Sequence, residues 1–117
     1  MAALSAITPT NTGAVSAGAA VAASDTVAQS IMGPRGAYLE IINGNAAVDN
    51  ITISDSGLTP AGNALNLSPG GVIADTVTNG TSQIYYLRHE QVNPATALIT
   101  ITHTVTPTVT YKLYPVG

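Results

Sequence analysis

Short runs in which apolar and polar residues alternate, separated by stretches rich in Gly, Pro and Asn, make up most of the chain. Such runs predict β-strands, because successive side chains of a strand point to opposite sides of a sheet. The predicted strands are Tyr38–Asn43, Asn50–Ser54, Val72–Val77, Ser82–Arg88, Ala97–Val105 and a final run on which Val109, Tyr111 and Leu113 share a face. No convincing amphipathic helix interrupts them. The pattern therefore predicts an all-β fold: a single antiparallel β-sandwich or jelly-roll-like domain of about seven or eight short strands.

Turn-forming residues divide these strands. A Gly/Asn/Ala loop follows Tyr38–Asn43 and predicts a hairpin with Asn50–Ser54. Asn79-Gly80 predicts a two-residue type I′ turn, and Pro69-Gly70-Gly71 predicts a chain reversal after the extended run Leu65–Ser68. Met32–Gly36 predicts a turn, and Asp55–Asn63, with two glycines and a proline, predicts a connection without a strand.

The beginning of the chain differs from the rest. Residues 1–12 are small, polar and turn-forming, which predicts a flexible N-terminal arm ahead of one sandwich domain over 13–117. A chain of 117 residues rarely supports two independent cores. Gly13–Ala23 has the Ala content of a helix, but its alternating Val and Ala residues also suit a strand, which we favour.

Two predicted strands are apolar on both faces. In Tyr38–Asn43 both sides carry large apolar groups, and in Ser82–Arg88 Tyr86 points opposite to Tyr85 and Leu87. One interpretation is that the tyrosines reach water with their hydroxyls at the end of a barrel. The other is that one face packs in the core and the other against a neighbouring subunit. Because only one face of each sheet lies inside a sandwich, we favour the second.

The charged residues exclude several classes of protein. They make up 8% of the chain, against about 25% in typical domains, so we expect the surface to be covered by a partner. Three Lys plus Arg and a net charge of −3 provide no basic surface for nucleic acid. The chain has no Cys, so it has neither a disulfide framework nor a thiolate site.

Candidate chemistry is sparse. His89-Glu90 is either an acid/base pair or a solvated loop cap, and we favour the cap. His103 shares a face with Ile99 and Ile101, which indicates a hydrogen-bonded histidine at the rim of the core rather than a metal ligand. No motif for a metal or a cofactor occurs. We expect no catalytic, cofactor or metal site, and the protein is not expected to be an enzyme.

The first residues lack the Lys or Arg of a secretory leader, and Ala14–Ala23 is too short to span a bilayer. We expect cytosolic synthesis and no membrane contact.

The order of these signatures resembles the small head-decoration, or minor capsid, proteins of tailed bacteriophages. The resemblance rests on the Ala-rich opening that ends in Ser24-Asp25-Thr26, the segments Gly33–Gly44 and Val48–Ser54, the turn Leu67–Gly71, and the closing strands Leu98–Thr104 and Thr108–Leu113. The chain departs from the family pattern at Gly36-Ala37 and in its long loop at 55–66.

The resemblance implies a virion structural protein, made in the host cytoplasm, that binds the outer surface of an icosahedral capsid and stabilises it. Its partners are then the major capsid protein and further copies of itself, as a homotrimer or another homo-oligomer. The runner-up is a tail or fibre component, a small carbohydrate- or host-binding β-sandwich module. The residues predicted to form the subunit or capsid interface are Ala2, Leu4, Ile7, Tyr38, Ile42, Tyr85, Tyr86 and Leu87.

Overall fold

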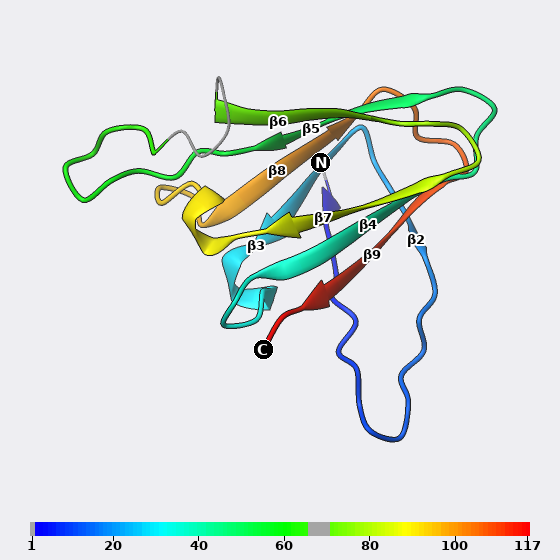
Figure 1. Ribbon diagram of the computed structural model, residues 1–117, viewed down its shortest axis with the longest axis horizontal. Coiled ribbons are helices and arrows are strands. Elements are labelled where there is room, and N and C mark those ends of the chain that lie inside the picture. Colours follow the sequence, from blue (N-terminus) through cyan, green and yellow to red (C-terminus); the bar gives the residue numbers. More distant parts are fainter. Residues whose placement is uncertain (1, 66–70) are drawn as a thin grey trace.

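Two β-sheets pack face to face in a sandwich (Figure 1). The structure is a computed structural model that describes residues 2–65 and 71–117. Its strands are β1 (Ala2–Ala3), β2 (Ala19–Ala20), β3 (Ser24–Ala28), β4 (Ala37–Asn43), β5 (Asp49–Ser54), β6 (Val72–Val77), β7 (Ser82–Leu87), β8 (Leu98–His103) and β9 (Val109–Pro115). Two short 3-10 turns are added, η1 (Gln29–Ile31) and η3 (His89–Gln91). The predicted all-β sandwich is confirmed, and no α-helix occurs in the described parts of the chain.

The strand order is that of a jelly roll. One sheet has the order β1-β3-β8-β5-β6 and the other β2-β9-β4-β7. From β2 onward, each described strand is followed by a strand of the opposite sheet, except that β5 and β6 pair within one sheet. Jelly rolls are built from such crossings. β1 lies outside this pattern, since it pairs in parallel with β3 at the sheet edge.

The hairpin predicted from β4 and β5 is wrong. The two strands lie in different sheets, and residues 44–48 carry the chain from one sheet to the other. The side-chain amide of Asn43 supports this crossing by donating to the carbonyls of Ala47, at 2.9 Å, and Val77, at 3.0 Å. Burial alternates along both strands, and their inner faces meet the shared core from opposite sides. Alternation predicts a strand and does not identify its neighbour.

The type I′ turn predicted at Asn79-Gly80 is also wrong. Gly80 has a φ of +75°, whereas Asn79 keeps a negative φ, and a type I′ turn needs positive φ at both residues. The N–H of Thr81 donates to the carbonyl of Thr78 at 3.1 Å, which closes a turn of type II character. This turn links β6 to β7 across the two sheets, so no hairpin twist has to be matched.

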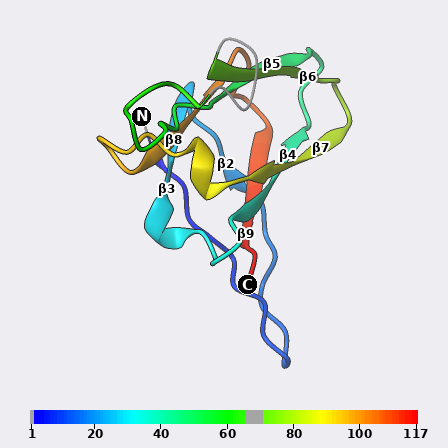
Figure 2. The same ribbon diagram turned by 60° about the vertical axis from the view of Figure 1, so that its left-hand side comes forward.

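Part of the predicted arm lies in the sandwich. Ala2–Ala3 form β1, Leu4 is buried, and the N–H of Ile7 donates to the carbonyl of Leu113 at 2.7 Å. Residues 8–18 are exposed, and Figures 1 and 2 show a loop here that stands off the body of the sandwich. The strand favoured over Gly13–Ala23 shortens to β2, because side chains this small bury little surface. Val15, the largest of the loop, is 85% exposed.

The remaining turns agree with the sequence, whereas β3, like the short β1, was not predicted. Gly33 and Gly36 exchange backbone hydrogen bonds in the predicted turn, and no strand forms over Asp55–Asn63. The predictions over Leu65–Ser68 and Pro69–Gly71 fall mostly on residues 66–70, outside the described residues. The pattern did not predict β3, a five-residue strand with a buried centre.

The core lies between the two sheets, and alternate residues of β4, β5, β8 and β9 supply most of it, with Val27 of β3, Val77 of β6 and Leu87 of β7 beside them. Its fully buried side chains include Leu39, Ile41, Ile51, Ile53, Ile99, Ile101, Val109 and Leu113. The predicted inward faces of β5, β8 and β9 are therefore confirmed. No helix in the described residues is long and apolar enough to cross a membrane.

The fold predicts a large difference between two isoleucines. Replacing the fully buried Ile101 by alanine is expected to lower the free energy of unfolding by about 2–5 kcal/mol, because it removes packed methylenes and leaves a cavity. Ile84→Ala, at a side chain that is 66% exposed, is the matched control and is expected to change it by less than about 0.5 kcal/mol. Urea unfolding followed by circular dichroism measures both, and similar losses in the two variants would contradict the placement of the core.

Candidate functional site

The outer surface of the four-stranded sheet carries the largest group of exposed apolar side chains. The outward residues of β9, β4 and β7 form rows across the sheet, because Tyr38 lies opposite both Tyr86 and Tyr114 in the strand register. We call this surface the tyrosine face. It consists of Tyr38, Glu40, Ile42, Ser82, Ile84, Tyr86, Thr110, Lys112 and Tyr114.

The aromatic row is held by contacts within the chain. The rings of Tyr38 and Tyr86 have centroids 5.6 Å apart at an interplanar angle of 48°, a favourable tilted arrangement. The Tyr86 hydroxyl donates to the carbonyl of Arg35, and the Tyr114 hydroxyl lies 2.6 Å from the Ser16 hydroxyl. Even so, Tyr38 is 47% exposed and Tyr86 46% exposed. The rings are therefore held in fixed orientations by the chain itself, while much of their surface stays in water.

Charge on the tyrosine face is small and balanced. Glu40 and Lys112 are its charged members, and they lie opposite each other on β4 and β9. Ile84 completes the same row on β7. A surface with one acid and one base repels neither an acidic nor a basic partner. Any contact made by this face would gain its free energy from burial of apolar area rather than from charge.

The structure separates the predicted interface residues into two groups. Tyr38, Ile42 and Tyr86 belong to the tyrosine face, whereas Leu87 and Leu4 are buried in the core of the chain itself. Core burial explains why Leu87, although next to Tyr86 in the sequence, offers no surface to a partner.

The other predicted interface residues lie away from this face. Tyr85 points to the inner side of β7 and packs against the core, Ala2 is exposed on β1, and Ile7 is half-buried beside β9. Sequence reasoning missed Ile84 and Tyr114. The alternation of Tyr114 with the inward Leu113 was the available signal for Tyr114, but it was used only to locate the core.

Tyr85 joins the two open sheet edges. Its hydroxyl donates to the carboxylate of Asp75 on β6 at 2.7 Å. Burial of the phenol, with the hydrogen bond to Asp75 and the negative charges of Asp75 and Asp49, raises the pKa of Tyr85 above its ordinary value of 10.0. This bond links the sheets on the side where β6 and β7 end them.

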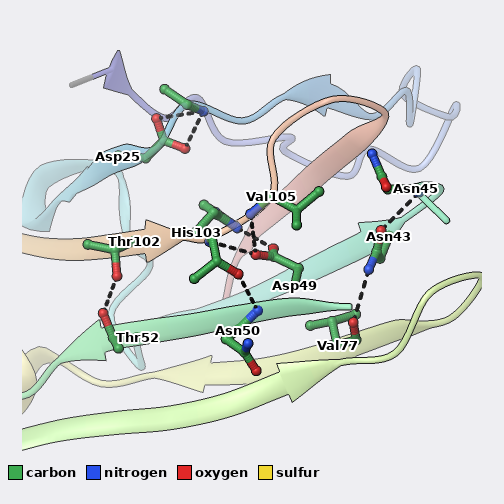
Figure 3. A network of polar contacts seen from close by, with 12 residues as sticks. Asp25, Asn43, Asn45, Asp49, Asn50, Thr52, Val77, Thr102, His103 and Val105 are labelled. Atoms are coloured by element: carbon green, nitrogen blue, oxygen red, sulfur yellow. Dashed lines mark hydrogen bonds and ion pairs between the residues drawn. The ribbon is translucent and has the colours of Figure 1, made fainter. Parts of the chain in front are cut away.

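A buried polar network closes one end of the core (Figure 3). The Nδ1–H of His103 donates to the Asp49 carboxylate at 2.6 Å, and that carboxylate also accepts the N–H groups of Thr104, at 3.0 Å, and Val105, at 3.2 Å. Both side chains are almost completely inaccessible. Asp49 thus satisfies the backbone where the chain leaves β8, and His103 is the hydrogen-bonded rim histidine that its position suggested.

His89 and Glu90 do not pair with each other in the structure. The His89 ring lies between the Gln29 side-chain amide, at 3.2 Å, and the carbonyl of Gly33, at 2.6 Å. Since a carbonyl only accepts, Nε2 of His89 donates to it. Glu90 lies instead 3.8 Å from Arg88 on the surface. This geometry ties η3 to η1 and to the turn that begins at Gly33, as expected of a loop cap.

Asp55 is buried at the opposite end of β5 from Asp49. Neither of its carboxylate oxygens accepts a hydrogen bond from the described residues. Its backbone N–H donates to the carbonyl of Gly71. Elsewhere in the described parts of the chain, no group of three or more His, Cys, Asp or Glu residues is placed to hold a metal ion.

The outer surface of the five-stranded sheet is mostly polar, with Val72 exposed at the beginning of β6. A shallow hollow of about 420 Å³ there is lined largely by Thr and Asn side chains of β5, β6 and β8. The hydroxyls of Thr52 and Thr102 bond across the strands, and Thr76 donates to Asn50 at 2.7 Å. These groups mostly satisfy one another, which distinguishes this surface from the tyrosine face.

Comparison with models of protein families, with curated proteins and with solved structures found no match for this chain.

The Asp49 network predicts a large stability effect. Asp49→Ala leaves the buried ring N–H of His103 and the partly buried N–H groups of Thr104 and Val105 without their acceptor, so the free energy of unfolding is expected to fall by about 3–5 kcal/mol. The control Asp75→Ala removes an exposed carboxylate with one phenol partner and is expected to cost less than about 1.5 kcal/mol. Chemical denaturation measures both, and equal losses would contradict the role given to Asp49.

The raised pKa of Tyr85 predicts that the folded chain loses stability at alkaline pH. The unfolded chain releases the Tyr85 proton near the ordinary pKa of 10.0, whereas the folded chain retains it to higher pH. Because the folded state then binds more protons, its stability falls as the pH rises above about 10. Urea midpoints at about pH 9 and about pH 11 are expected to fall less in Tyr85→Phe than in the unaltered chain. Identical falls would show that Tyr85 makes no such contribution.

Proposed function

We propose that this chain is a virion structural protein, without enzymatic activity, that binds the outer surface of an icosahedral phage capsid and stabilises it. The observation that carries the proposal is the tyrosine face: a nearly uncharged sheet surface with an exposed Ile84 and two half-exposed tyrosines. Exposed apolar patches of this kind mark protein contacts. The resemblance of the strand and turn signatures to phage decoration proteins supplies the class of partner, the major capsid protein and further copies of the chain.

The energetics suit a protein present in many copies. Complete burial of one large apolar side chain contributes about 1.5–3 kcal/mol, and association itself costs several kcal/mol. A contact made by a few tyrosines and isoleucines is therefore modest for one copy. Contacts repeated over a lattice multiply such affinities by avidity. A shell surface presents its sites at fixed spacing, so weak single contacts are sufficient there.

The projecting loop at residues 8–18 supports the same use. It carries no charged residue, it is exposed throughout, and its tip is closed by a turn in which the N–H of Gly13 donates to the carbonyl of Thr10 at 3.1 Å. Ser16 brings its returning limb beside Tyr114 and the tyrosine face. Loop and face thus adjoin, and in the proposal both contact the capsid or a neighbouring copy at the virion surface, after synthesis in the host cytoplasm.

A second candidate function is a carbohydrate- or host-binding module on a tail or fibre. The row of Tyr114, Tyr38 and Tyr86 favours it, because aligned aromatic rings on a sheet face also suit the apolar faces of sugar rings. Jelly rolls occur in both viral capsid and lectin domains. The two functions differ in what the tyrosine face binds: a protein shell or a glycan.

Substitution of neighbouring tyrosines tests the proposal. Tyr86→Asp places a charge on the tyrosine face and is expected to leave the fold intact while weakening co-sedimentation with purified capsid shells at least tenfold, or about 1.4 kcal/mol. Tyr85→Asp, one residue away, puts the charge on the inner side of β7 against the core and is expected to lower the unfolding midpoint instead.

Shell binding by a folded Tyr86→Asp variant at the unaltered affinity would refute the role of the tyrosine face. Retention of the unaltered chain on an insoluble polysaccharide, lost in Tyr86→Asp and accompanied by no shell binding, would establish the second candidate in place of the first.

A further inference from the structure

β7 is an open edge of the four-stranded sheet, and its free backbone groups can be assigned. Along β4 and β7, the pair Asn43 and Thr81 is hydrogen-bonded, since the N–H of Asn43 donates to the carbonyl of Thr81 at 2.9 Å. Bonded and non-bonded positions alternate along an antiparallel pair. The backbone N–H and C=O groups of Ser82, Ile84 and Tyr86 therefore point away from β4, and no hydrogen bond to them occurs among the described residues.

This edge lacks the features that normally prevent strand addition. Ser82–Leu87 contains no charged residue, proline or glycine, and it is six residues long. Natural sheet edges are usually interrupted by a charge, a proline, a bulge or a very short strand. β6, the edge of the other sheet on the same side, has Asp75 directed inward, and β1 and β2 have two residues each. Among the four edges, β7 alone is long and free of charge.

We propose that β7 pairs with β7 of a second copy of this chain, antiparallel and around a two-fold axis through Ile84. In this register Ile84 lies opposite Ile84 of the partner subunit, and Ser82 lies opposite Tyr86 of the partner subunit. Every free N–H and C=O of the three outward-directed residues then acquires a partner. The two four-stranded sheets join into one continuous sheet.

The side chains agree with this register. Opposite residues of an antiparallel pair point to the same side, so the two Ile84 side chains, each 66% exposed in the single chain, pack against each other. The tyrosine faces of the two copies join into one surface. Like charges stay apart in this register. Arg88 extends beyond the strand end opposite Gly80 of the partner subunit, and Glu40, opposite Ile84 on β4, lies three strand spacings, about 14 Å, from Glu40 of the partner subunit.

A second copy fits the edge better than an unrelated strand does. A two-fold contact needs a surface complementary to itself, and here the central residue is the exposed apolar one, with equal lengths of uncharged strand on both sides. Pairing of β7 would provide the contact between copies that the proposed function requires, and its biological role rests on that function. It is tested on purified protein without shells, so a failure here and a failure of shell binding are distinguishable.

Two proline variants test the edge. Ile84→Pro removes an N–H that the fold does not use and blocks the approach of a strand; edge strands accept proline at such positions. Sedimentation equilibrium up to about 1 mM, the weak end of specific affinities, is expected to show a dimer for the unaltered chain and a monomer for Ile84→Pro. Ala74→Pro makes the same change on the edge of β6 and is expected to leave the dimer intact. A monomeric unaltered chain, or equal effects of the two prolines, would overturn the inference.

Cysteine variants test the register even where a proline impairs folding. The chain has no native cysteine, so Ile84→Cys is expected to form a disulfide-linked dimer under mild oxidation, because opposite Cα atoms of a bonded pair lie about 5.5 Å apart. Ser82→Cys places its two cysteines four residues apart across the axis, about 13 Å, and is expected not to cross-link. Ala74→Cys controls for random collision. Cross-linking of all three at one rate, or of Ser82→Cys alone, would overturn the two-fold axis through Ile84.

Discussion

Every long strand of this protein directs one face into a core shared by two sheets, and the rest of the structure depends on that constraint. The side chains that fill the space between the sheets are almost completely buried; they include Leu39, Ile41, Ile51, Ile53, Ile99 and Ile101. Because successive side chains of a strand point to opposite sides, burial of one set exposes the other. The tyrosine face is the consequence on one sheet, and the Thr-rich surface is the consequence on the other.

The ends of the strands must satisfy backbone groups that the sheets leave free. Jelly-roll crossings carry the chain over the ends of the core, where N–H and C=O groups would be buried without partners. Asn43 serves the crossing between β4 and β5, and Asp49 with His103 serves the crossing after β8. The few polar residues inside this weakly charged protein are therefore concentrated where the chain changes sheets. Their hydrogen bonds hold the crossings between the sheets in place.

The two outer surfaces differ in how well their groups are satisfied. On the five-stranded sheet, Thr52 bonds to Thr102 and Thr76 bonds to Asn50, so these polar groups are satisfied within the chain. On the four-stranded sheet, Tyr38, Tyr86 and Ile84 retain large exposed areas, and β7 leaves one side of its backbone unpaired. Backbone N–H and C=O groups without a partner among the described residues and exposed apolar side chains thus occur together along β7.

Alternation along the chain predicted the all-β class, six strands to within a few residues, and the inward residues of β5, β8 and β9, because alternation is a local property. It also indicated that β4 and β7 have two apolar faces. Only the tertiary structure decided that β4 and β5 lie in different sheets, that Leu87 and Leu4 are core residues, and that Ile84 and Tyr114 join Tyr38 on one surface. The physical reason is that neighbouring strands of a jelly roll are distant in sequence. Which apolar face is covered depends on the opposite sheet, and residue order along one strand does not contain that information.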